Sequence, residues 1–285
     1  MSNDLFDLSG RTALVTGASR GIGEAIAHLL AHYGAHVVCT SRKLDGCQAV
    51  ADAITAKGLK AEAAAMHIGD TDAIDALFDG LAAQGRQIDI LVNNAAANPY
   101  YGPLLDMDLG SFGKILDVNL RGYFYTSQRA ARQMPPGSAI VNIASVNAER
   151  PAPGQAVYSL TKAGIVNLTQ GFAKELAAKG IRVNAVLPGL TDTHFASAIT
   201  QDAKLMKLMT QLIPMGRSGQ PSEIAPAVLF LASNAASYVT GTTLIHPELS
   251  AKRIQLLKEA APGITRLAVI WNPNSPAGAD TVRET

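Results

Sequence analysis

The sequence is poor in cysteine, in net charge and in long apolar runs, and each shortage excludes a class of protein. Its 285 residues include two cysteines, Cys39 and Cys47, which cannot make a disulfide framework, and no Cys/His cluster has the spacing of a zinc site. Lysine and arginine number 24 against 23 acidic residues, so the net charge of +1 lacks the basic excess that a nucleic-acid backbone attracts. No apolar run reaches the roughly 18 residues of a membrane span, and Asp4 stands where a signal peptide carries lysine or arginine. We therefore expect a cytoplasmic protein without a metal, nucleic-acid or membrane partner.

Apolar residues, by contrast, are plentiful and regularly spaced. They make up 48% of the chain against 16% charged residues, which favours a packed core over disorder. Apolar runs bounded by turn residues alternate with segments of helical period, a pattern typical of repeated βα units. We expect one α/β domain over residues 1–245, a Rossmann-like doubly wound parallel sheet flanked by helices. Its expected strands are 12–15, 36–39, 61–67, 88–92, 139–143, 182–187 and 242–245.

The segments between these strands have the period of amphipathic helices. Gly34 and Gly180 each follow such a segment, at the position where a left-handed residue ends a helix most easily. No internal repeat or low-complexity linker interrupts the alternation. The expected helices are 21–33, 44–57, 71–84, 110–133, 155–179 and 221–233, with a short one near 196–212.

A glycine-rich turn follows the first expected strand and leads into the first helix. Gly17, Gly21 and Gly23 are spaced as GxxxGxG. Gly17 allows the tight turn, Gly21 a close approach of the backbone to phosphate, and Gly23 the packing of the helix on the strand. Backbone N–H groups and the positive helix end would then face a pyrophosphate. An ordinary turn is the alternative interpretation, because a glycine-rich turn alone is a weak signal.

Basic residues follow the second strand, where an NAD-preferring site carries an acidic residue for the ribose 2′-hydroxyl. The strand runs into Ser41, Arg42 and Lys43, with no carboxylate. Arg42, and Arg20 from the glycine turn, can make bidentate contacts to a 2′-phosphate. The sequence therefore favours NADP over NAD, with a solvated basic turn as the alternative.

Three polar residues have a spacing that suits proton transfer. Tyr158 and Lys162 lie four positions apart in an expected helix and so share one face. A phenol with a pKa of about 10 is a poor acid or base at neutral pH, and a nearby ammonium favours its ionised form. Ser145 follows an expected strand 13 positions before Tyr158, so both hydroxyls can aim at one carbonyl oxygen. A serine that caps a loop and a tyrosine that packs are the alternative for either residue alone.

In this order, the glycine turn, residues 93–96 (Asn-Asn-Ala-Ala), Ser145 and the Tyr158/Lys162 pair resemble the classical short-chain dehydrogenase/reductase family over about residues 8–244. The resemblance implies that Tyr158 is the general acid/base, that Ser145 bonds the substrate oxygen and that Lys162 lowers the tyrosine pKa and binds ribose. It also implies that Asn119 holds a proton-relay water. The cofactor-binding residues that it implies are Gly17, Ser19, Arg20, Gly21, Ile22, Gly23, Ser41, Arg42, His67, Ile68, Asn93, Ala95, Tyr158, Lys162, Pro188, Gly189, Thr191 and Thr193.

The function implied is an NAD(P)-dependent oxidoreductase that moves hydride between the cofactor and a secondary alcohol or ketone. A non-catalytic, NAD(P)-binding redox sensor of the same fold is the alternative. Two departures from the family pattern are small: Ala96 replaces a glycine, and His67 replaces an acidic contact to adenine, which would then need the imidazole or the backbone.

The third departure is larger, because the family's Asp-Gly-Gly turn after residue 244 is replaced. Residues 246–285 look similar to a short piece of bacterial ABC-transporter substrate-binding proteins, and we interpret them as a foreign or spliced end. A family-specific appendage is the alternative. Pro247 should end strand pairing near His246, ahead of an expected helix at 248–260. We expect a homo-oligomer: a dimer through helices 110–133 and 155–179, with the family's tetramer weakened or lost.

Overall fold

The computed structural model describes residues 5–245, which form two compact units. The larger unit runs to Leu187 and resumes over residues 221–244, and the smaller one comprises Pro188–Gln220. Of the expectations for the C-terminal segment, the helix at 248–260 and the strand end at His246 lie outside the described residues.

A seven-stranded sheet forms the centre of the larger unit, in the order β3-β2-β1-β4-β5-β6-β7. Every pairing from β3 to β6 is parallel, and residues 13–15 of β1 align with both neighbours, which confirms the doubly wound fold. The central strands β4 and β5 are buried along their whole length and apolar except for one asparagine each, as suits a parallel sheet covered by helices. The strands are β1 (Thr12–Thr16), β2 (His36–Ser41), β3 (Ala61–Ala65), β4 (Ile90–Asn93), β5 (Ala139–Ile143), β6 (Arg182–Leu187) and β7 (Thr243–Ile245).

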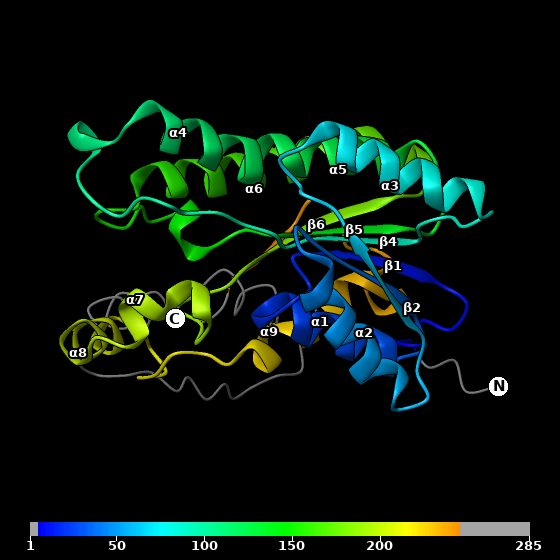
Figure 1. The fold of residues 1–285 in the computed structure, drawn as a ribbon, viewed down its shortest axis with the longest axis horizontal. Coiled ribbons are helices and arrows are strands. Elements are labelled where there is room, and N and C mark those ends of the chain that lie inside the picture. The colour runs from blue at the N-terminus through cyan, green and yellow to red at the C-terminus, as the bar shows by residue number, and fades with distance from the viewer. Residues whose placement is uncertain (1–4, 246–285) are drawn as a thin grey trace, which may run out of the picture. The chain divides into compact units, whose positions relative to one another are not determined.

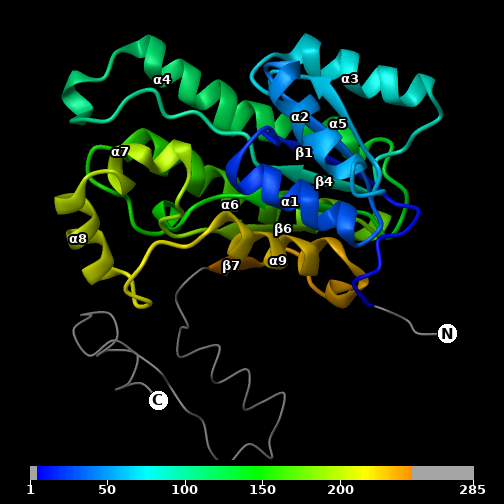
Figure 2. The ribbon, with the colours of Figure 1, turned by 60° about the horizontal axis from the view of Figure 1, so that its bottom comes forward.

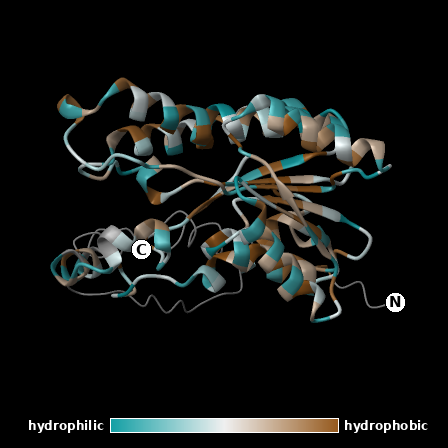
Figure 3. Cartoon of the chain, in the orientation of Figure 1, coloured by the Kyte–Doolittle hydropathy of each residue, from teal (hydrophilic) through white to brown (hydrophobic). Residues whose placement is uncertain are grey.

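Helices cover both faces of this sheet (Figure 1). One layer contains α3, α4, α5 and α6, and the other contains α1, α2 and α9, with α1 and α9 side by side in Figure 2 as well. Apolar residues gather on the strands and on the inward helix faces (Figure 3). The helices are α1 (Gly21–His32), α2 (Leu44–Thr55), α3 (Thr71–Ala83), α4 (Leu109–Leu116), α5 (Gly122–Ala131), α6 (Ala156–Leu176) and α9 (Pro221–Ala232).

Local sequence explains where several helices begin and end. The Asp70 carboxylate accepts hydrogen bonds from the N–H groups of Asp72 and Ala73, which caps the start of α3. Gly34 follows α1 with φ of +99°, and a Cβ there would lie 2.6 Å from the Ser9 hydroxyl oxygen. The position after α1 therefore needs glycine, as its place in the sequence predicts.

The helix expected at 110–133 has a different form in the structure. It consists of α4 and α5 joined by a π-turn at Asp117–Arg121, and α4 begins at Leu109. Such turns insert one residue into a helix and redirect its side chains. The sequence keeps an unbroken helical period here, and Asn119 within the insertion is bonded to Ala97 and Thr161 of other segments. In the described part of the chain, no helix is both long enough and apolar enough to cross a bilayer.

Candidate active site

The glycine turn at residues 17–23, between the end of β1 and the first turn of α1, forms a backbone cradle. Gly17 and Gly21 have φ of +67° and +62°, in the left-handed region that favours glycine. A Cβ on Gly23 would lie 2.3 Å from the Gly17 carbonyl oxygen, so the turn meets the helix only because that side chain is missing. Arg20 precedes α1 with an exposed side chain that does not cap the helix. The exposed N–H groups and the helix end fit the pyrophosphate of a dinucleotide.

Asn94 fixes this cradle from the end of the neighbouring strand. Its amide Nδ2 donates to the carbonyl oxygens of Thr16 at 2.9 Å and Gly17 at 3.2 Å. The Thr16 hydroxyl in turn accepts from the N–H groups of Asn94 at 2.9 Å and Ala95 at 3.1 Å. This role of Asn94 was not expected from the sequence, although an asparagine directly after a buried strand is a usable signal. The N–H of Ala95 is thus already bonded within the protein.

Ser41 and Arg42 lie at the end of β2, beside the cradle. The N–H of Ala18 donates to the Thr40 carbonyl at 3.0 Å, which ties the glycine turn to this strand. The side chains of Arg20 and Arg42 are exposed, and neither forms an ion pair with another residue between positions 5 and 245. Two guanidinium groups without carboxylate partners fit a site for a 2′-phosphate.

The residues expected beside adenine follow β3. The His67 ring is turned toward its own loop, where Nδ1 accepts from the N–H of Gly69 at 3.1 Å. Ile68 is buried, and a Cβ on Gly122 would lie 2.5 Å from the Ile68 carbonyl oxygen. The Asp70 carboxylate is engaged in capping α3, so this loop offers imidazole, backbone and an apolar side chain.

Tyr158 and Ser145 meet where β5 ends and α6 begins. Tyr158 is 8% exposed, and its phenol shares a hydrogen bond with the Ser145 hydroxyl. Ser145 also accepts from the N–H of Asn147 at 3.1 Å, which holds its side chain at the start of a short 3-10 turn. Burial raises the pKa of Tyr158 above its usual value, and the hydrogen bond with Ser145 lowers it by less. The phenol therefore keeps its proton at neutral pH in this environment.

Lys162 lies beneath Tyr158, one turn further along α6. Its ammonium donates to the Ile143 carbonyl oxygen at 2.8 Å and lies over the rings of Tyr123 and Tyr158, at 5.3 and 5.4 Å from their centres. Burial lowers the pKa of Lys162 to about 7, so its charge is incomplete near neutral pH. Burial is the largest influence on both pKa values, and the effect of Lys162 on the pKa of Tyr158 stays a prediction. Tyr123, which sequence reasoning missed, also donates to the Ile143 carbonyl, at 3.2 Å.

Asn119 is fully buried in the π-turn and joins the loop after β4 to α6. Its Oδ1 accepts from the N–H of Ala97 at 2.8 Å, and its Nδ2 donates to the Ala97 carbonyl at 2.9 Å and the Thr161 hydroxyl at 3.3 Å. The side chain expected to hold a relay water is therefore bonded to protein groups.

Asn93 lies at the end of β4 with its side chain inside the unit. Nδ2 donates to Ser127 and Asn142, each at 3.0 Å, and Oδ1 accepts from Thr126 at 2.7 Å. These bonds use the whole amide, so Asn93 stabilises the packing of β4 on α5. A contact of this residue with cofactor would have to come from its backbone.

Four of the expected cofactor residues belong to the smaller unit. The Thr191 hydroxyl donates to the Gly189 carbonyl at 3.1 Å, and the Thr193 hydroxyl accepts from the N–H of Ala196 at 3.3 Å. Pro188 is buried, and Thr191 pairs with Gly219 as an isolated bridge. The helix expected near 196–212 is split into α7 (Ser197–Thr200) and α8 (Ala203–Leu212).

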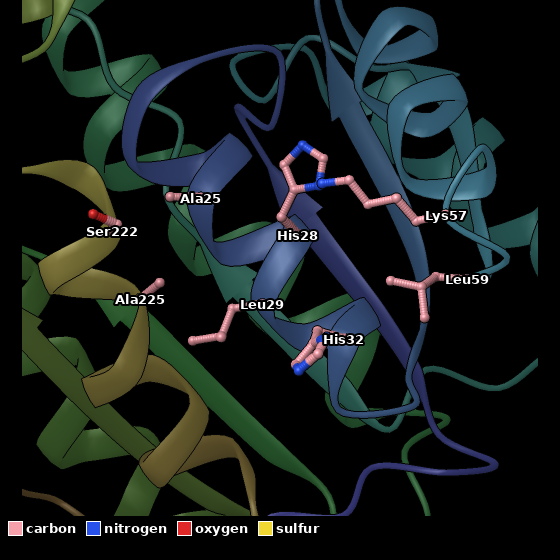
Figure 4. Close-up of a pocket in the computed structure, with 8 residues that line it drawn as sticks. All are labelled: Ala25, His28, Leu29, His32, Lys57, Leu59, Ser222 and Ala225. Atoms are coloured by element: carbon pink, nitrogen blue, oxygen red, sulfur yellow. The ribbon is translucent and has the colours of Figure 1, made fainter.

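A hollow of about 310 Å³ lies on the outer side of α1, against α9 and the end of α2 (Figure 4). His28 and His32, which share a helix face, line the hollow together with Lys57 and with apolar alanine and leucine side chains. Burial lowers the pKa of His28, and the nearby Lys57 lowers it further. This hollow offers neither carboxylate nor thiol, and the described residues contain no cluster of three or more metal-ligating side chains.

Comparisons with known proteins agree with this arrangement. A family model described as enoyl-(acyl carrier protein) reductase matches residues 17–247. The gluconate 5-dehydrogenase of Gluconobacter oxydans (strain 621H) is 38% identical over 247 residues, covering 85% of this chain and 95% of that protein. The 3-oxoacyl-(acyl-carrier-protein) reductase of Staphylococcus aureus (strain MW2) is 40% identical over 237 residues, covering 82% and 95%. A gluconate 5-dehydrogenase from Burkholderia cenocepacia J2315, solved with NADP and tartrate, has 35% identity and a TM-score of 0.81, covering 85% of this chain and 95% of that one.

Proposed function

The chain belongs to the classical short-chain dehydrogenase/reductase family and is an NAD(P)-dependent oxidoreductase acting on alcohol or ketone groups, and from that premise we propose that Tyr158 is its general acid/base. The observation that carries this proposal is the hydrogen bond between the phenol of Tyr158 and Ser145, with the Lys162 ammonium 5.4 Å from the centre of the Tyr158 ring. Two hydroxyls that share one hydrogen bond can both reach a single carbonyl oxygen.

The residues divide the work between binding and proton transfer. When bound, the nicotinamide supplies or accepts the hydride at the carbon that carries the reacting oxygen. Ser145 donates to that oxygen and orients it toward Tyr158. Because burial keeps the phenol protonated, Tyr158 is set to give its proton to the developing alkoxide, which suits reduction of a ketone. The Lys162 ammonium is bonded to the Ile143 carbonyl, so it holds α6 against the end of β5. The same ammonium binds ribose.

We propose NADP as the preferred cofactor, with NAD as the alternative. Arg20 and Arg42 support this choice because both are exposed beside the cradle, and β2 ends without a carboxylate that would repel a 2′-phosphate. His67, Ile68 and the backbone at Asn93 and Ala95 would lie along the adenosine half. Pro188, Gly189, Thr191 and Thr193 would hold the nicotinamide half.

A substrate panel tests the function. NADPH and NADH absorbance is followed with simple ketones, keto sugar acids and 3-oxoacyl thioesters, the last two chosen because the matched relatives carry names of such activities. Oxidation of NADPH by any of these ketones, abolished in Tyr158→Phe, supports the proposal. Tight NADPH binding without turnover on any substrate would instead support a redox sensor.

We further propose a cytoplasmic homo-oligomer whose residues 246–285 add no second activity. The family model ends at residue 247, so residues 246–285, which we interpret as a foreign or spliced end, lie almost wholly beyond the match. Residues 1–245 would then be the single catalytic domain. A chain truncated after His246 should keep the NADPH-dependent activity of the full chain.

A further inference from the structure

The buried ammonium of Lys162 lies against two aromatic rings from different helices. Lys162 is 1% exposed, and no ion pair among the described residues includes it. Its ammonium lies over the ring of Tyr123 from α5 and over the ring of Tyr158 from its own helix. It also donates to the Ile143 carbonyl at the end of β5. One neutral carbonyl and two ring faces therefore surround this charge in place of water.

The two rings differ in their relation to the reaction. Tyr158 belongs to the hydroxyl pair with Ser145, so its charge changes in the reaction that we propose. Tyr123 is 2% exposed, and its hydroxyl donates to the Ile143 carbonyl at 3.2 Å. Burial raises the pKa of Tyr123 well above its ordinary value of 10, so this hydroxyl remains a donor at neutral pH. The Tyr123 ring is thus a neutral face with a constant charge distribution beside the ammonium.

The start of α5, which carries Tyr123, is held on both its neighbours. A Cβ on Gly122 would lie 2.5 Å from the Ile68 carbonyl oxygen, so α5 approaches the loop after β3 closely only because this side chain is missing. The Thr126 hydroxyl donates to Asn93 Oδ1 at 2.7 Å, which ties the next turn of α5 to the end of β4. These contacts fix the backbone of Tyr123 relative to the sheet.

We infer that Tyr123 is a positioning residue for the reaction, whose ring face keeps the buried ammonium of Lys162 protonated and seated against the Ile143 carbonyl beside Tyr158. The inference rests on the proposed roles of Lys162 and Tyr158. The face of an aromatic ring carries partial negative charge, so it favours an ammonium over a neutral amine. Burial acts in the opposite direction and lowers the pKa of Lys162 to about 7, so the ring opposes the loss of the proton. In the proposed reaction, a charged ammonium beside the phenol favours its ionised form and so makes Tyr158 a stronger acid.

A titration of Lys162 measures the charge of the ammonium directly. The full chain is prepared with isotope-labelled lysine, and the Cε signal of Lys162, assigned with Lys162→Met, is followed by NMR from about pH 5 to about pH 10. Tyr123→Leu removes the ring and keeps the site apolar, so the pKa of Lys162 should fall by about one pH unit. Tyr123→Phe keeps the ring face and should change this pKa by less than about a third of a unit. Tyr125→Leu is the matched control and should have no effect, because Tyr125 lies on the same helix but bonds Asp75.

The pH dependence of turnover shows whether this charge serves the reaction. At saturating NADPH, kcat for ketone reduction should fall as Lys162 loses its proton. The midpoint of this fall should lie about one pH unit lower in Tyr123→Leu than in the wild type, and Tyr123→Phe should keep the wild-type midpoint.

An unchanged pKa of Lys162 in Tyr123→Leu would overturn the inference, and so would a lowered pKa without a shift in the kcat profile. Equal shifts in Tyr123→Leu and Tyr123→Phe would assign the effect to the hydroxyl or to packing and also overturn it. If Tyr123→Leu fails to fold in a thermal-unfolding control, Tyr123→Met, which fills the space without a ring, decides the question. Full activity of Tyr158→Phe, or no turnover of any ketone by the wild type, would overturn the proposed function and the inference with it.

Discussion

The ammonium of Lys162 is bonded to the main-chain carbonyl of Ile143 at 2.8 Å, two residues before Ser145. The lysine therefore anchors α6 to the strand end that presents Ser145. The Ile143 carbonyl has a second donor in the Tyr123 hydroxyl, at 3.2 Å, so it stays satisfied if the lysine is replaced. Because the ammonium is buried, this anchor has a cost in stability that depends on pH.

Lys162→Met should stabilise the fold near neutral pH and flatten its pH dependence. Burial lowers the pKa of Lys162 in the folded chain from its ordinary 10.5 to about 7. Between these values the unfolded chain binds a proton that the folded chain lacks, so the free energy of unfolding of the wild type rises with pH. Below about pH 7 both states are protonated and the burial cost is fully present. The variant's gain in the free energy of unfolding over the wild type should thus be largest below about pH 7. Above that pH the gain should shrink by at most ~1.4 kcal/mol per pH unit.

Denaturant unfolding at about pH 6.5, 8 and 9.5 measures this change. Lys174→Met, an exposed position on the same helix, is the matched control and should leave the profile unchanged. A constant difference between wild type and Lys162→Met across the range would show that the ammonium is charged throughout.

Tyr158→Phe should reduce kcat by about 10³-fold, because the reacting oxygen loses its proton donor. The Kd of NADPH should change by less than about two-fold, since the ring and its packing remain. Tyr123→Phe is the control: Tyr123 is equally buried and contacts the Ile143 carbonyl, and we expect less than about a ten-fold loss in kcat. Comparable losses in both variants would mean that Tyr158 acts through packing.

Arg42→Asp should shift the ratio of kcat/KM values from NADPH toward NADH. The new carboxylate repels a 2′-phosphate and can accept a hydrogen bond from a ribose 2′-hydroxyl. We expect about a 100-fold change in the ratio, the effect of losing one charge-assisted contact and adding a repulsion. Lys60→Asp makes the same charge change at an exposed position just before β3. Because β2 and β3 are parallel, Lys60 lies at the edge of the sheet opposite to Arg42, and the variant should leave the ratio unaltered.

The parallel sheet and the closeness of Tyr158, Lys162 and Ser145 could be predicted because each depends on a local rule. Strand ends of parallel βα units meet at one edge, and residues four apart share a helix face. The surroundings of these groups could not be predicted in the same way. Tyr123 reaches Lys162 from another helix, and only the packed structure shows that burial outweighs the hydrogen bond with Ser145 in its effect on the pKa of Tyr158.

The hydrogen-bond partners of Asn93 and Asn119 could not be predicted from the sequence either. Their positions match a family pattern, which says nothing about how many protein partners each amide has. In the structure both amides are bonded to protein groups, Asn93 inside the unit and Asn119 to the backbone of Ala97. Asn119 lies in the π-turn at Asp117–Arg121, which the helical period of the sequence does not indicate.

The last prediction concerns assembly through α4, α5 and α6. Apolar side chains are exposed on this layer: Leu109 on α4 is 84% exposed, Leu160 on α6 is 54% exposed, and Phe124 on α5 is 40% exposed. Phe124 lies 5.9 Å from Phe172 of α6, centre to centre, so the two helices present a joint aromatic surface. Patches of this kind mark interfaces between protein chains. We expect a dimer through these helices.

Phe124→Lys should raise the dimer Kd by about 30-fold, the effect of losing one aromatic anchor at an interface. Light scattering across a dilution series measures this change. Tyr238→Lys, at a fully exposed aromatic that belongs to none of these helices, is the control and should leave the mass unchanged. The same measurement on a chain truncated after His246 tests the expected effect of the last 40 residues, 246–285. Recovery of a tetramer on truncation is the expected result, because most of the residues expected to weaken the tetramer would then be absent. A stable tetramer of the full chain would contradict the prediction.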